Sequence, residues 1–199
     1  MKKICLLIAA AFITAGLSFG QEKYCSAEGK SLVEYGYRDG KLDSACTNPK
    51  ANKTYKSPKC IQYKRSASKF DNVKIHPQSK LENVSAFASY DSISPKLKMK
   101  VYSTAPAGTM VEIQLAKKGI NDYPKGVHSQ FQAKTSKQNE WEELTFNFIN
   151  NPKGSEVSST EIDEIIILFS PNTTGNDTYY FGDIIGPKLI TASTSVNKK

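Results

Sequence analysis

The sequence predicts an all-β protein folded as an antiparallel β-sandwich of the jelly-roll type. Apolar and polar residues alternate along most of the chain, and this period of two puts every second side chain on one face of a strand. Turn residues recur between the alternating segments, as in "APAG", "NDYPKG" and "NNPKG". No segment of ten or more residues carries an apolar stripe at helical spacing. Many short strands joined by such turns are typical of sandwiches and jelly rolls.

The first twenty residues have the pattern of an export signal. Two lysines precede an apolar run from Ile4 to Ala15, and the closing "SFG" is a small-x-small cleavage pattern. The run is too short for a membrane span, and no later segment is apolar enough to form a spanning helix. We therefore expect residues 1–20 to be removed and the mature chain to be secreted, periplasmic or attached to the cell surface.

The mature chain divides into three parts by pattern. Residues 21–47 are expected to form a hairpin appendage, because "RDGK" supplies an Asp-Gly turn between two alternating segments. Residues 48–190 are expected to form the β-sandwich domain, and residues 191–199 read as a frayed polar tail. Removal of the signal leaves Cys25, Cys46 and Cys60, which permit one disulfide in an oxidising compartment. The hairpin favours Cys25–Cys46, and Cys46–Cys60 remains an alternative.

Four segments show the strand pattern most clearly. In "KLKMKVY", Leu97, Met99 and Val101 share one face, and "MVEIQLA" and "WEELTFNF" alternate in the same way. "EIIILF" is almost wholly apolar, as expected of a central strand buried on both faces. In "DTYYFGDIIGP", Tyr179, Phe181 and Asp183 are expected on one face, opposite Tyr180 and Ile184, which suits a core strand.

The net charge of +8 comes almost entirely from lysines that are spread along the chain. Nucleic-acid readers usually gather arginine and lysine into a patch, so this distribution argues against a nucleic-acid partner. It fits a soluble exported protein with a mild attraction to anionic polymers. The two histidines show no ligand spacing with the cysteines, which argues against zinc.

Several motifs in order resemble a known group: "KLKMKVYSTAPAGTMVEIQLAKKG", "YPKGVHSQFQAKTSKQNEWEELTFNF", "DEIIILFSP" and "DTYYFGDIIGP". They resemble exported β-sandwich modules of Bacteroidetes-type bacteria, which are similar to galactose-binding-domain-like, carbohydrate-binding jelly rolls. The resemblance implies a glycan partner. Such modules often carry two acids on the last strand, one of them at a structural calcium ion; here Gly182 takes the first position and Asp183 the second. Asp183 is thus the one candidate metal ligand, and otherwise no cofactor is expected.

Sugar recognition needs an aromatic ring for the C–H face of a pyranose and polar side chains for its hydroxyls. The loop "NDYPKGVHSQFQ" offers Tyr123, His128 and Gln132 for these roles, although an ordinary loop with a locally satisfied histidine is the alternative. Trp141, the one tryptophan, could stack on a sugar from the face opposite Leu144, or could fill the sandwich.

Catalysis is the less favoured reading. Glu161 and Asp163 could face the same way, but the acid that a glycosidase pattern requires after them is replaced by isoleucines, and a solvated strand end explains both. The sequence therefore predicts a non-catalytic module that binds a poly- or oligosaccharide. The alternative is a periplasmic or cell-surface structural sandwich that binds other proteins and no glycan.

Overall fold

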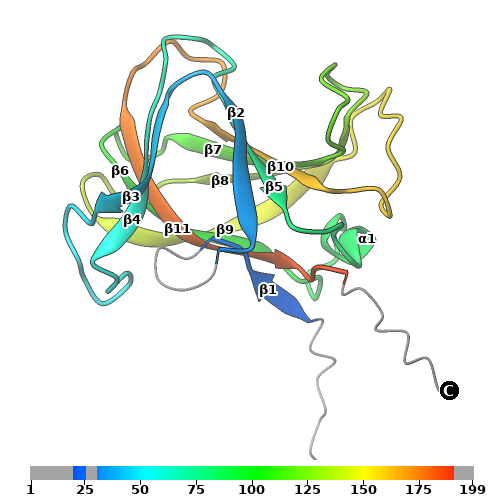
Figure 1. Ribbon diagram of the computed structural model, residues 1–199, viewed down its shortest axis with the longest axis horizontal. Helices are drawn as coiled ribbons and strands as arrows, with labels where there is room; N and C mark the ends of the chain where they lie inside the picture. The colour runs from blue at the N-terminus through cyan, green and yellow to red at the C-terminus, as the bar shows by residue number, and fades with distance from the viewer. Residues whose placement is uncertain (1–19, 26–30, 191–199) are drawn as a thin grey trace, which may run out of the picture.

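The computed structural model describes residues 20–25 and 31–190 (Figure 1). The expected tail and all but Gly20 of the expected signal lie outside these residues. The strands are β1 (Gln21–Lys23), β2 (Val33–Arg38), β3 (Lys41–Thr47), β4 (Lys59–Lys64), β5 (Val73–Pro77), β6 (Leu97–Ser103), β7 (Met110–Ala116), β8 (Val127–Lys134), β9 (Trp141–Asn150), β10 (Glu164–Phe169) and β11 (Thr178–Pro187). One helical turn, α1 (Val84–Phe87), completes the described elements, and none of them is a helix long and apolar enough to span a bilayer.

The strands form two layers that are joined into one nearly closed sheet. The first layer has the order β2-β5-β10-β7-β8, and the second has the order β6-β11-β4-β3 with β1 added to β11. Strand β9 connects them, because residues 141–146 pair with β6 and residues 147–150 pair with β8. Every pairing is antiparallel. The all-β antiparallel fold predicted from the period of two is confirmed.

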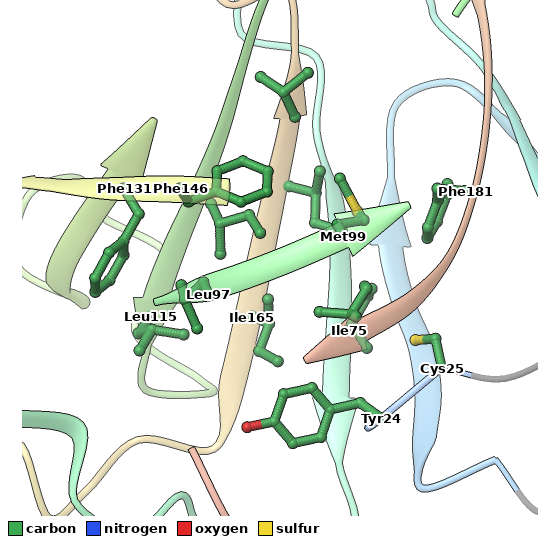
Figure 2. Packing of buried hydrophobic residues seen from close by; sticks show 14 of the residues in the cluster. Tyr24, Cys25, Ile75, Leu97, Met99, Leu115, Phe131, Phe146, Ile165 and Phe181 are labelled. Carbon is green, nitrogen blue, oxygen red and sulfur yellow. The ribbon is translucent and has the colours of Figure 1, made fainter. Parts of the chain in front are cut away.

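The hydrophobic core lies between the two layers (Figure 2). Leu97, Met99 and Phe181 of the second layer point toward Ile75 and Ile165 of the first, and all five are at most 1% exposed. Alternation along each strand produces this arrangement, since every second residue faces inward. Burial of these side chains is the main stabilising contribution, at roughly 1.5–3 kcal/mol for each large apolar residue.

The predicted hairpin of residues 21–47 is not formed. Strand β2 pairs with β5 in the first layer, whereas β3 pairs with β4 in the second. The Asp39-Gly40 turn therefore carries the chain from one layer to the other instead of closing a local pair. Gly40 is required there, because a Cβ atom would lie 2.2 Å from the Lys64 carbonyl oxygen.

The expected Cys25–Cys46 disulfide is not supported either. Cys46 and Cys60 are opposite each other on β3 and β4, with their Sγ atoms 2.9 Å apart. Cys25 lies apart from this pair, in the main core with Tyr35, and all three cysteines are free thiols in the structure. Burial raises the pKa of the Cys25 thiol to about 12.

A smaller buried cluster lies on the outer side of the second layer. It consists of Cys46, Tyr55, Cys60 and Trp141, and Tyr102 and Tyr180 pack against it. Trp141 is fully buried, with its ring 4.2 Å from the ring of Tyr55. The connection between β3 and β4 covers this cluster, and we call residues 48–58 the lysine loop.

Strand β11 changes its alternation partway along. Tyr179 and Phe181 point into the core as predicted, but Asp183 has a φ of 48° and the register with β6 shifts between Gly182 and Ile185. The irregularity is a β-bulge, which adds one residue to one strand of a pair. Ile184 is therefore buried, and Asp183 turns to the outer side, so the predicted shared face of Phe181 and Asp183 is wrong.

Candidate binding groove

The outer side of the first layer is hollowed into a groove of about 660 Å³. This volume lies within the usual range of ligand sites. Strand register places the floor in two rows: Leu168, Glu112 and Gln132 lie side by side in one, and Ile166, Gln114 and Gln130 in the other. The β10 side of the floor is therefore apolar, and the β7 and β8 side carries carboxylate and carboxamide groups.

A hydrogen-bond network fixes the polar half of the floor. Glu112 Oε1 accepts hydrogen bonds from Gln114 Nε2 at 2.7 Å and from Gln130 Nε2 at 3.0 Å. Glu112 Oε2 accepts one from Gln132 Nε2 at 2.6 Å. Because each carboxamide turns its nitrogen toward Glu112, the oxygens of Gln114 and Gln132 can accept a hydrogen bond from a ligand hydroxyl, while the Gln130 oxygen accepts one from the Tyr123 hydroxyl at 3.5 Å.

Two exposed aromatic rings stand at opposite ends of the groove. Strands β5 and β7 both pair antiparallel with β10, so they run in the same direction. Phe70 comes just before β5 and therefore lies at one end of the groove, whereas Tyr123 comes after β7 and lies at the other end. Phe70 is 62% exposed and Tyr123 is 63% exposed, and both line the cavity. A single exposed ring is ordinary on a protein surface, but two of them beside one partly apolar cavity indicate a contact surface.

A buried ion pair supports the Phe70 end. Arg65 and Asp71 have fully buried side chains, with Arg65 Nε 3.7 Å from Asp71 Oδ2. Asp71 also accepts hydrogen bonds from the Ser66 amide at 2.6 Å and from the Tyr63 hydroxyl. Arg65 Nη1 donates to Thr173 at 2.9 Å, which ties the loop before β5 to the loop after β10. Phe70 is thus presented by an anchored segment.

The Tyr123 end is held by backbone hydrogen bonds within the loop between β7 and β8. The Gly126 amide donates to the Asp122 carbonyl at 3.0 Å, and the Val127 amide donates to the Pro124 carbonyl at 3.0 Å. A Cβ atom at Gly126 would lie 2.1 Å from the Ile120 carbonyl oxygen, so the loop closes too tightly for another residue. These constraints place the Tyr123 ring over the edge of the groove.

The groove carries little net charge. Its charged lining residues are Lys74, Glu112 and Asp122. Lys74 Nζ lies 3.2 Å from Glu164 Oε1 and donates a hydrogen bond to Asn121 at 2.8 Å, so its charge is already balanced. A floor with one carboxylate and three carboxamides suits hydroxyl groups better than anions.

The structure places the predicted binding residues in different regions. Tyr123 and Gln132 both line the groove. His128 lies on β8 outside the lining, where burial lowers the pKa of its imidazole and favours the neutral ring. Trp141 is buried in the second layer, where Trp141 Nε1 donates a hydrogen bond to Asn48 Oδ1 at 2.9 Å.

Sequence reasoning missed Phe70 and three floor residues, Glu112, Gln114 and Gln130. A usable signal was present, because Glu112 and Gln114 alternate with core residues on one strand, and Gln130 and Gln132 do so on the next. Two such pairs on neighbouring strands meet on one face when the strands pair in register.

The surroundings of Asp183 do not fit a calcium ion. Asp183 Oδ1 lies 3.3 Å from Lys23 Nζ, and Asp183 Oδ2 lies 2.9 Å from Lys100 Nζ. Calcium requires six to eight oxygen ligands. The Asp183 carboxylate instead forms ion pairs with the two ammonium groups, which would repel a cation. In the part of the chain that the structure describes, no three His, Cys, Asp or Glu side chains are grouped to hold a metal ion.

Glu161 and Asp163 are occupied by structural contacts. Lys117 Nζ lies 2.5 Å from Glu161 Oε1, and the Lys118 amide donates to Asp163 Oδ1 at 2.7 Å. The hydrogen bond from Lys117 is the main reason that the pKa of Glu161 falls to about 2, with Ser158 contributing next. A carboxyl group with so low a pKa is poorly suited to act as a general acid.

No family model and no curated protein sequence matches this chain. Among solved structures, it is similar to the family 11 carbohydrate-binding module from Clostridium thermocellum in complex with a β-1,3-1,4-mixed-linked tetrasaccharide, with 15% identity, a TM-score of 0.48, and coverage of 88% of this chain and 98% of that one. It is also similar to a family 29 carbohydrate-binding module from Piromyces equi, with 11% identity, a TM-score of 0.44, and coverage of 83% and 88%. Similarity at this level does not assign a ligand to this chain.

Proposed function

We propose that this protein is an exported, non-catalytic module that binds an uncharged poly- or oligosaccharide in the groove of the first layer. The observation that carries the proposal is the pairing of two exposed rings, Phe70 and Tyr123, with a polar floor organised around Glu112. A pyranose presents apolar C–H faces and a rim of hydroxyls, so a chain of sugars matches a surface that alternates rings and hydrogen-bonding groups.

The charge of the groove supports an uncharged ligand. The Glu112 carboxylate at the floor and Asp122 at the edge repel uronate or sulfate groups, while Lys74 is held by Glu164. Sugar hydroxyls, in contrast, can donate to the Glu112 carboxylate and the carboxamide oxygens. Export and the removal of residues 1–20 belong to the same proposal and rest on the pattern of the first twenty residues.

Binding to a panel of neutral polysaccharides tests the proposal. Glucans, mannans, xylans and galactans are compared by affinity electrophoresis, and a retained polymer is then titrated by calorimetry. We expect Phe70→Ala and Tyr123→Ala each to weaken binding by about 5- to 30-fold, because loss of a stacking ring costs about 1–2 kcal/mol.

Tyr37→Ala is the matched control, because Tyr37 is 59% exposed on β2 and does not line the groove. It should leave affinity unchanged. If a folded protein is retained by none of the polymers, the proposal is wrong and the protein-binding alternative gains. If Tyr37→Ala weakens binding as much as Tyr123→Ala, the groove is not the binding site.

A further inference from the structure

A second cavity, of about 350 Å³, lies on the outer side of the second layer and is strongly basic. We call it the lysine pocket. Its charged lining residues are Lys23, Lys53, Lys56, Lys100 and Asp183. The strands beneath it are β1, β6 and β11, whereas the groove lies over β5, β7, β8 and β10. The two cavities are thus on opposite layers of the sandwich.

The cations of the lysine pocket are unequally compensated. Lys23 and Lys100 share the single carboxylate of Asp183. Lys53 and Lys56 are exposed, and neither forms an ion pair with any residue that the structure describes. The pocket therefore keeps an excess of positive charge that an anion can balance.

The lysine loop is ordered by its own contacts, so the pocket is already formed. Asn52 Oδ1 accepts hydrogen bonds from the Thr54 amide at 2.8 Å and the Tyr55 amide at 3.0 Å. Asn48 joins both sides of the loop, because Asn48 Nδ2 donates to the Ser57 carbonyl at 2.7 Å. Tyr55 is buried against Trp141, which anchors the loop between Lys53 and Lys56. A pre-formed site spends less binding free energy on ordering.

The β-bulge of β11 completes the pocket. It turns Asp183 outward, where the carboxylate positions the two ammonium groups of Lys23 and Lys100. Lys100 Nζ also lies 5.9 Å from the centre of the Tyr55 ring. Asp183, read from the sequence as a metal ligand, thus acts here as a support for lysines.

We infer that the lysine pocket binds the carboxylate or sulfate groups of an acidic polysaccharide, independently of the groove. Lysine presents a point charge with three donors and matches single anionic groups spaced along a polymer. A membrane surface fits less well, because the large apolar side chains exposed in the described residues, such as Phe70, Tyr90 and Ile93, do not line this pocket. A nucleic acid fits less well too, since the pocket offers no arginine and its one aromatic residue, Tyr55, is buried.

The test compares two double variants that lose the same charge. Lys53→Gln/Lys56→Gln removes the unpaired cations of the pocket. Lys80→Gln/Lys118→Gln removes two exposed lysines from another cavity, whose lining also contains the carboxylates of Glu34 and Asp163. The mature chain is titrated with polygalacturonate and with dextran sulfate, and neutral dextran is the uncharged reference. Circular dichroism confirms that every variant is folded.

We expect wild-type protein to bind at least one of the two acidic polymers, with an affinity that falls as salt is added. Lys53→Gln/Lys56→Gln should weaken that binding by about tenfold, because it removes two of the four cations of the pocket. Lys80→Gln/Lys118→Gln should change it by less than about twofold, since distant exposed charges are screened. Preference between the two polymers identifies the anionic group as a carboxylate or a sulfate.

Three results would overturn the inference. The first is that neither acidic polymer binds at low salt. The second is that both double variants lose the same affinity for the polymer, because binding would then depend only on the net charge of the protein. The third is binding to vesicles of anionic phospholipid without binding to either polymer. Neutral-glycan binding in the groove is measured separately on the same variants, so that failure of one site does not decide the other.

Discussion

Replacing Glu112 with glutamine tests whether one carboxylate organises the groove. Glu112→Gln keeps the size and shape of the side chain but turns one acceptor oxygen into an NH₂ donor. Glu112 Oε1 accepts hydrogen bonds from Gln114 and Gln130, whereas Oε2 accepts one from Gln132. The remaining oxygen is expected to keep the place of Oε1 and its two hydrogen bonds. The new amide nitrogen then faces the nitrogen of Gln132, and this contact is lost.

The cost follows from that geometry. A hydrogen bond to a charged group contributes about 1.5–3 kcal/mol, and removing the charge also weakens the two bonds that remain. Gln132 is only partly buried, so water can satisfy its freed amide and the cost stays near the lower end. We expect a loss of about 1.5–2 kcal/mol, which for a chain of this size corresponds to a fall in Tm of about 3–8 °C.

Differential scanning calorimetry measures the loss, with Glu143→Gln as control. Glu143 forms an exposed ion pair with Lys98 at 3.0 Å, and such a pair contributes no more than about 1 kcal/mol. The same variants are titrated with a neutral glycan that wild-type protein binds, and Glu112→Gln should weaken it. If Glu112→Gln has the same Tm as Glu143→Gln and binds the glycan as tightly as wild type, the Glu112 carboxylate does not organise the floor of the groove.

Three further predictions concern the rest of the molecule. A Cβ atom at Gly182 would lie 2.5 Å from the Tyr55 hydroxyl, so Gly182→Ala should destabilise by about 1–3 kcal/mol, and Tyr55→Phe in the same chain should recover part of this in thermal melts. The lowered pKa of Glu161 stabilises the fold above its ordinary value of 4.5, and this contribution is lost as pH falls toward 2. The melting temperature of Glu161→Gln should therefore be lower than that of wild type at pH 6 and equal to it near pH 2. Because Glu161 is exposed, the difference at pH 6 should be small and should shrink when salt is added. Oxidised glutathione should join Cys46 to Cys60 with loss of two hydrogens, seen as one linked peptide by mass spectrometry, because their Sγ atoms are 2.9 Å apart.

Each of these predictions has a contrary outcome. Equal melting of Gly182→Ala and wild type would mean that the Tyr55 ring moves aside freely. A difference between Glu161→Gln and wild type that stays constant from pH 6 to pH 2 would contradict the lowered pKa of Glu161. Linkage of Cys25 in place of either partner would contradict the packing of Cys25 in the main core.

Alternation of side chains was enough to predict the strands but not their partners. The segments around Leu97, Val111 and Phe146 form strands with the predicted inward faces. The Asp39-Gly40 turn, however, reads the same whether its flanking strands pair together or join opposite layers. Whether β2 and β3 pair with each other or enter opposite layers depends on their contacts with β5 and β4, which lie further along the chain.

One other error, and one choice that the sequence left open, came from features that a local pattern does not contain. The bulge at Asp183 adds one residue and reverses the alternation beyond it. Trp141 lies on the outer side, as the alternation indicates, but the lysine loop folds over that side and buries it. Both are consequences of tertiary packing, which local alternation does not encode.

The candidate site could be predicted in part for a related reason. Tyr123 stood out because it combines an aromatic ring with a proline-containing loop, and it does line the groove. Glu112 and the glutamines resembled an ordinary solvated strand face. Only the pairing of β7 with β8 brings them into one network, and only the anchored loop before β5 brings Phe70 to its end.

The position of Trp141 allows its fluorescence to report on the second layer of the sandwich and not on the first. Its indole is stacked on Tyr55 beneath the lysine loop, and the groove lies on the opposite layer. Emission from this single tryptophan should therefore change when an anion occupies the lysine pocket and should stay unchanged when a sugar fills the groove. In a titration with both ligands, a change in tryptophan fluorescence would then report binding in the lysine pocket and not binding in the groove.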